Sequence, residues 1–271
     1  MARPAFGPRA RVGGLIVAGC VVMAVLAPML APYRPDAVDF ASMLLPPCKS
    51  HLFGTDDLGR DVLSRVLFGV RSSFIVSIAS IGFAFFVGTA VGIAAGYHGG
   101  WIDEILMAIA NAILSFPAIL VALALASAIG PRVENALMAI AMVNIPVFAR
   151  LARSQTLVVR ELNYVLAARA LGLGHWHILM RTLVPNVISP LIVQVSLLVA
   201  SAVIMESYLS FLGLSAQPPT PTLGSMLRQA IGFLDQAPWL AWFPGLAILL
   251  GVLGFNLLGD GLRDYLDPQQ R

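Results

Sequence analysis

The protein has 271 residues, of which 58% are hydrophobic and only 11% are charged, with a formal net charge of +3. Soluble domains carry roughly 25% charged residues, so this composition excludes a chain whose whole surface faces water. The apolar runs are also too long for the strands of a membrane β-barrel, which need about 10 residues, so helices are the expected spanning elements.

Six windows of the chain contain no Asp, Glu, Lys or Arg. Five of them are long enough to span a membrane, and the shorter one, 135–149, can be extended past Arg150. Since a spanning helix needs about 20 mostly apolar residues, we predict an all-α, polytopic membrane protein with six transmembrane helices. The predicted spans are 13–31, 73–97, 104–129, 134–153, 187–212 and 239–260. Pro117 and Pro146 are expected to kink the third and fourth spans, and Arg150 can reach the interface with its long side chain.

The N-terminal tail is basic, with Arg3, Arg9 and Arg11 and no acidic residue. A cleaved signal peptide is one interpretation, and an uncleaved first span with its basic end inside is the one we adopt. The segment 150–181 is the second strongly basic region. Cytoplasmic loops are rich in Arg and Lys, and four spans separate the two regions. We therefore predict that both termini and the 154–186 loop are cytoplasmic.

Residues 54–70 have a helical pattern between the first two spans. Thr55 or Asp56 can cap a helix, and an apolar stripe with four-residue spacing follows. The stripe consists of Leu58, Val62, Val66 and Val70, and the polar side holds Asp57 and the pairs Asp56–Arg60 and Asp61–Arg65. We favour an interfacial helix that bridges the two spans; the alternative is a part of the outer mouth of a transport pathway.

The stretch NYVLAARALGLGHWHILMRTLVPN, residues 163–186, lies between the fourth and fifth spans. Good helix formers followed by Gly172 and Gly174 predict a helix and a stop. A second short helix is expected to end at Pro185. Small residues at positions 167, 168, 170 and 172 allow close approach of another backbone. The stretch is either an amphipathic helix on the headgroups or a docking element for a cytoplasmic partner.

Few residues in the chain are candidates for catalysis, metal binding or a transport pathway. Glu206 is the one acid deep in a predicted span, and it is expected either to take part in a transport pathway or to pack between helices. The single lysine, Lys49, is not in a P-loop, and no acid–base pair, nucleophilic triad or metal-ligand spacing is present. We expect a non-enzymatic chain without its own cofactor or metal, in which His175 and His177 are loop residues.

Several stretches resemble, in order and over nearly the whole chain, the dipeptide/oligopeptide/nickel branch of binding-protein-dependent ABC importer permeases, in particular its second permease subunit. They are HLFGTDDLGRDVLSRVLFGVRSS (51–73), SFPAILVALAL (115–125), SFLGLSAQPPTPTLGSML (210–227) and FPGLAILLGVLGFNLLGDGLRDYLDP (243–268). The 154–186 loop is similar to the coupling loop of that family. Its pattern is Glu-Ala-Ala, three residues, Gly, then Ile-x-Leu-Pro after nine more, with departures here at Leu166, Thr182 and Val184.

The resemblance implies a type I ABC importer permease with a tail, first span and extracytoplasmic segment over 1–71 and a permease core over 72–271. It implies ATPase-coupling residues in the loop, namely Leu166, Ala167, Ala168, Arg169, Gly172, Gly174, His175 and Pro185. The implied partners are a homologous second permease, two cytoplasmic ATP-binding subunits or one fused ATPase that bind ATP and Mg, an extracytoplasmic binding protein and the lipid of a bacterial inner membrane, without nucleic acid.

The expected cargo is a dipeptide or oligopeptide, because short peptides are the commonest substrates of the branch. Nickel complexes or haem are the alternatives within the same transporter class. A stand-alone secondary transporter and a membrane enzyme are the other classes. The first would need coupling-ion carboxylates at the midplane, and the second would need site chemistry that the chain does not display.

Overall fold

The computed structural model describes residues 7–266, except for the side chains of Leu166, Arg169, His175 and Leu266. All named elements in this range are helical. The longer helices are α1 (Pro8–Leu30), α2 (Val62–His98), α3 (Gly100–Leu114), α4 (Ala118–Ile129), α5 (Val133–Arg160), α8 (Val184–Phe211) and α10 (Trp239–Leu266). The shorter elements are α6 (Asn163–Ala170), α7 (His175–Ile178), α9 (Leu223–Ala230), a π-helical turn Leu179–Leu183 and the 3-10 turns Phe40–Ser42 and Ile231–Phe233.

The expectation of a polytopic helical protein is confirmed. Within the described part of the chain, five helical segments are long and apolar enough to cross a membrane alone, and α3 and α4 pass the same test only together, as a bent pair, which gives up to six candidate spans. The two helices of that pair meet at 91°. Pro117 directly precedes α4 and has no N–H to continue the hydrogen bonds of α3. The third span is therefore broken, whereas α5 stays one helix across Pro146.

Close backbone contacts hold the centre of the fold together. Gly88, Gly92 and Gly96 line one face of α2 where it packs on α5. A Cβ on Gly92 would lie 2.2 Å from the carbonyl oxygen of Ala149, so no larger residue fits there without moving a helix. Small residues allow such approach between membrane helices, where dispersion rather than water release drives packing. α8 packs on both helices of this pair and completes the central group.

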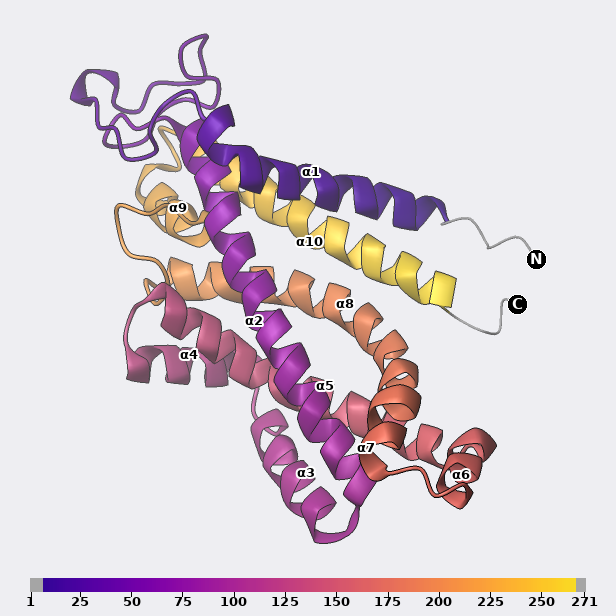
Figure 1. The fold of residues 1–271 in the computed structure, drawn as a ribbon. Helices are drawn as coiled ribbons and strands as arrows, with labels where there is room; N and C mark the ends of the chain where they lie inside the picture. Colours follow the sequence, from indigo (N-terminus) through magenta and orange to yellow (C-terminus); the bar gives the residue numbers. More distant parts are fainter. Residues whose placement is uncertain (1–6, 267–271) are drawn as a thin grey trace.

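The first span is held by the last one. α1 lies beside α10 (Figure 1), and a Cβ on Gly13 would meet the backbone nitrogen of Leu258 at 2.4 Å. Figure 1 also shows that the start of α1, the end of α10 and the α6–α7 region lie on one side of the molecule. Residues 31–61, which we call the cap, lie on the opposite side with α9. The helices therefore separate the α6–α7 region, at one end of the molecule, from the cap and α9 at the other end.

Candidate functional site

The loop between α5 and α8 has the predicted helix–break–helix form. After α6 the amide of Leu171 bonds to the Ala167 carbonyl at 3.0 Å, and the amide of Leu173 bonds to the Ala168 carbonyl at 3.2 Å. Gly172 between them has a φ of +73°. A left-handed residue that closes a helix in this way is most often glycine, because glycine has no Cβ to clash. Gly174 then leads into α7.

The second short helix does not end at Pro185, so that part of the prediction is wrong. α7 continues through the π-helical turn Leu179–Leu183 into α8, where Pro185 is in the first turn. The amide of Val184 bonds to the Leu179 carbonyl, five residues back. Proline is tolerated in the first turn because its missing N–H is not needed there. The wide turn before it lets one helical segment run from Trp176 to Phe211.

Large apolar side chains point out of this loop. Leu171 is 80% exposed and Trp176 is 70% exposed, and Tyr164 and Leu173 are also exposed. Ala167 and Ala170 leave small exposed positions on α6, whereas Ala168 is buried against its own chain. The small residue at 168 therefore serves the internal packing of the loop. The side chains of Leu166, Arg169 and His175, which the sequence also singled out, lie outside the described residues.

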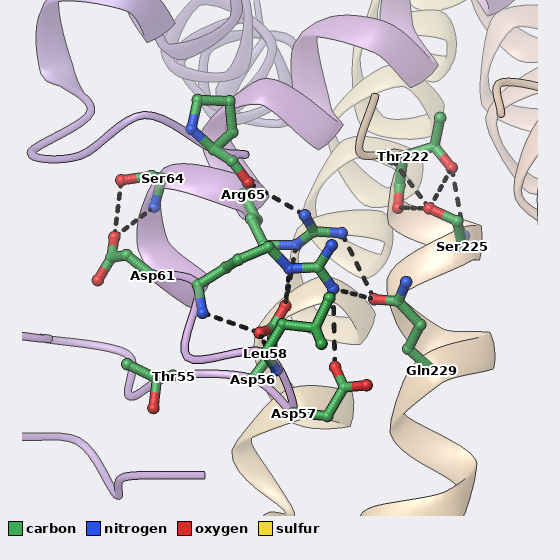
Figure 2. A network of polar contacts seen from close by, with 12 residues as sticks. Thr55, Asp56, Asp57, Leu58, Asp61, Ser64, Arg65, Thr222, Ser225 and Gln229 are labelled. Atoms are coloured by element: carbon green, nitrogen blue, oxygen red, sulfur yellow. Dashed lines mark hydrogen bonds and ion pairs between the residues drawn. The ribbon is translucent and has the colours of Figure 1, made fainter. Parts of the chain in front are cut away.

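The cap is fastened to the helices by a buried ionic network (Figure 2). Asp56 accepts a hydrogen bond from Arg60 Nε at 2.7 Å and lies 3.4 Å from Arg65 Nε. Its other oxygen accepts from the amides of Leu58 and Arg60, both at 2.9 Å. Gln229 of α9 accepts from both arginines, at 3.5 Å and 3.4 Å. All three charged side chains are nearly inaccessible, so the network forms a connection between cap, α2 and α9.

This network corrects the expectation of an interfacial helix over 54–70. α2 begins only at Val62, and Leu58 precedes the helix. Gly59 has a φ of +72° and lies against Asp39 of the cap, which makes residues 54–61 a turn rather than a helix. The expected Asp56–Arg60 pair exists but is buried, with Asp57 3.6 Å from the same arginine.

The second expected pair does not form. Asp61 caps α2 by accepting from the Ser64 amide at 2.8 Å, and it also contacts His51 Nδ1 at 3.0 Å. Its acceptor capacity is used at the helix N-terminus, where unpaired amides favour an acidic cap. Arg65 turns instead to Asp56 and to the Pro35 carbonyl, 3.1 Å away.

Glu206 is fully buried near the end of α8. Its Oε1 accepts a hydrogen bond from Ser215 Oγ at 3.1 Å, while Oε2 has no hydrogen-bond partner in the described part of the chain. Ser215 belongs to the segment between α8 and α9, whose far end is tied back through a short contact between Thr222 and Ser210. This geometry places Glu206 in the packing between helix and loop.

A cavity of about 700 Å³ lies between α3, α5 and α8, and the sequence analysis did not find it. It is lined by apolar side chains and by polar groups from all three helices. Two arginines one turn apart on α5 face it. Arg153 is held by Asp103 of α3 through two contacts of 2.5 Å. Arg150, which the sequence placed at the membrane interface, has no such partner among residues 7–266.

Comparison with known proteins decides what this arrangement of helices is. Residues 88–271 match the family described as "Binding-protein-dependent transport system inner membrane component". The chain belongs to this family. Residues 8–47 of the permease also match the "N-terminal TM domain of oligopeptide transport permease C". The two matches together include α1, the end of α2 from Gly88 onward and every later helix of the fold.

Curated relatives cover nearly the whole permease. It is 42% identical over 260 residues to the dipeptide transport system permease protein DppC of Alkalihalophilus pseudofirmus, which covers 96% of this chain and 86% of the relative. It is 43% identical to the probable D,D-dipeptide transport system permease protein DdpC of Escherichia coli, over 94% of this chain and 86% of the relative. It is also 43% identical to the glutathione transport system permease protein GsiD of Pectobacterium atrosepticum, over 94% of this chain and 85% of the relative.

A solved structure has the same fold. The permease is similar to a chain of an inward-facing MetNI methionine ABC transporter, with a TM-score of 0.61 and 18% identity. The likeness covers 75% of this chain and 97% of the other. The fold is therefore that of a type I importer permease, and the expectation drawn from the resemblance is confirmed.

Proposed function

We propose that the permease is one half of the translocation pathway of an ATP-driven importer of short peptides. The observation that carries the substrate class is the set of relatives named for dipeptides, D,D-dipeptides and glutathione, a tripeptide, at 42–43% identity. Nearly full coverage of both chains supports a shared architecture rather than a shared fragment. The chain itself hydrolyses nothing, and ATP with Mg is bound by partner ATPase subunits.

The proposed assembly contains a homologous second permease, two ATP-binding subunits or one fused ATPase, and an extracytoplasmic binding protein. The basic N-terminal tail and the 150–181 segment support an orientation with both termini in the cytoplasm. The α6–α7 loop lies on the side where α1 starts and α10 ends. In this orientation the loop faces the ATPases, and the cap faces the binding protein.

The exposed apolar residues of the loop support its role as the docking element. Among the described apolar side chains of the loop, Leu171, which directly follows α6, and Trp176 of α7 are the most exposed. An amphipathic helix laid into an apolar groove is a common recognition mode, and large aromatic residues supply much of the binding energy of such contacts. Closure of the ATPases would move α5 and α8 through this loop and drive alternating access.

Truncation of Trp176 tests the docking. In the reconstituted complex, Trp176→Ala should lower the affinity for the ATPases at least about 30-fold, since loss of an aromatic anchor costs about 2 kcal/mol or more. ATP hydrolysis should lose its response to loaded binding protein. Trp101→Ala is the matched control, because Trp101 is 71% exposed near the turn between α2 and α3. Equal effects of the two variants, or none, would exclude this loop as the specific docking element.

Uptake measurements separate the substrate alternatives. Proteoliposomes that contain the whole transporter should import radiolabelled dialanine with ATP and binding protein. Haem or a nickel complex at the same concentration should not compete. Import of either alternative without import of peptide would assign the permease to that cargo within the same transporter class. Import that needs an ion gradient and no ATPase would instead identify a secondary transporter.

A further inference from the structure

The cavity between α3, α5 and α8 contains an unbalanced positive charge. Arg150 lines it and is exposed, and no hydrogen bond or ion pair within residues 7–266 engages its guanidinium. Arg153 beside it differs, because both of its contacts with Asp103 are at 2.5 Å and one carboxylate balances that charge. An ionised side chain within a spanning helix is costly unless something compensates it, and such residues mark ion and substrate pathways.

The surroundings of Arg150 suit a small zwitterion. Asn111 of α3 and Gln194 of α8 line the same cavity with amide groups that can donate to, and accept from, a peptide bond. Met107 and Leu151 supply apolar surface for a side chain. The volume of about 700 Å³ falls in the range of sites that hold small molecules. Three helices therefore bring a cation, amides and apolar groups to one cavity.

The surroundings of Arg150 favour a carboxylate in transit over a lipid phosphate as its partner. Arg150 shares its cavity with the amides of Asn111 and Gln194, which can bind a peptide backbone and which a lipid phosphate does not need. A carboxylate that passes through the cavity meets the guanidinium with the bidentate geometry typical of this pair.

We propose that this cavity is a transient binding site for peptide in transit, in which Arg150 binds the C-terminal carboxylate and Asn111 and Gln194 bind the peptide backbone. The site rests on the proposed peptide substrate and adds the residues that recognise it. In the orientation proposed above it lies in the cytoplasmic half of the pathway. The peptide meets it after leaving the binding protein, so it would favour free-acid peptides over peptides with a blocked C-terminus.

The test uses a photoreactive dipeptide, alanyl-photoleucine, and its C-terminal carboxamide. Both are supplied to the complete transporter in proteoliposomes with ATP and binding protein, and import and cross-linked residues are measured together. The wild type should import the free acid and form adducts on Met107 or Leu151. Arg150→Gln should lower import and adducts of the free acid about tenfold, the loss expected for one charge-assisted hydrogen bond. It should leave the smaller signal of the carboxamide unchanged.

Two variants complete the design. Arg150→Lys keeps the charge and should retain most of the preference for the free acid. Arg132→Gln removes an exposed arginine at the other end of α5, outside the cavity, and should behave as the wild type.

The outcomes separate this site from the proposed substrate. Import of the free acid by the wild type with an equal loss of both peptides in Arg150→Gln would assign Arg150 to folding or lipid binding and overturn the site alone. Unchanged free-acid import in Arg150→Gln, or adducts only outside the cavity, would do the same. If the wild type imports neither peptide, the proposed substrate fails and the site falls with it.

Discussion

Replacing Asp56 by Asn should destabilise the permease by roughly 3 kcal/mol, because it leaves two buried arginines without their shared anion. The side chains of Asp56, Arg60 and Arg65 are 5%, 8% and 3% exposed. Removing one partner of a buried pair typically costs about 3–5 kcal/mol. Asp57, 3.6 Å from Arg60 and 32% exposed, still offsets part of the charge, which places the expectation at the lower end.

The assay is thermal unfolding in lipid nanodiscs, followed by tryptophan fluorescence. Trp239 is a local reporter, since its Nε1–H donates to the Thr55 carbonyl at 3.2 Å, next to Asp56. At roughly 2–4 °C per kcal/mol for a chain of this size, the midpoint should fall by about 6–12 °C. Asp36→Asn is the matched control, because the Arg34–Asp36 pair is on the surface and is worth below about 1 kcal/mol. Equal shifts of less than about 3 °C for both variants would refute the view that the network stabilises the cap.

Two further predictions concern orientation and the buried acid. Cys48 is free and exposed in the cap, and the hydrogen bond with Ser50 lowers the pKa of its thiol, so an impermeant maleimide should label it from outside intact cells. Glu161→Cys in a Cys48→Ser background should be labelled only after permeabilisation, and the reverse result would invert the proposed topology. Glu206→Gln should lower transport or complex stability more than Glu134→Gln, because only Glu206 is fully buried and bonded to Ser215; equal, negligible changes in uptake and melting midpoint would show that this contact is dispensable.

Local signals in the sequence were enough for the long apolar helices and for the break in the loop. Long uncharged windows predict the spans because a helix in lipid satisfies its backbone hydrogen bonds within one segment. The stop after α6 was predictable from Gly172, since the left-handed conformation there favours glycine by local sterics. Pro117 likewise marked the break between α3 and α4 through its missing N–H.

The conformation of the cap and its ion pairs depend on contacts between residues that are far apart in the sequence. The pattern at 54–70 has good helical spacing, but Gly59 turns the chain against Asp39 and the helix starts later. Arg65 could have paired with Asp61 by spacing alone. It pairs with Asp56 instead and meets Gln229, which is 164 residues away in the chain. Sequence spacing shows which ion pairs are possible, and the tertiary packing determines which of them form.

The sequence by itself thus determined the long apolar helices, the breaks at Pro117 and Gly172 and the family that the chain resembles. Only the tertiary structure decided which faces of the helices meet. Arg150 and Arg153 are both cations near the end of one span, and the sequence does not distinguish their roles. Asp103 reaches Arg153 from 50 residues away, and Asn111 and Gln194 line the same cavity as Arg150 from two other helices. The rotation and packing of α3, α5 and α8 set these distances, and no local pattern encodes them.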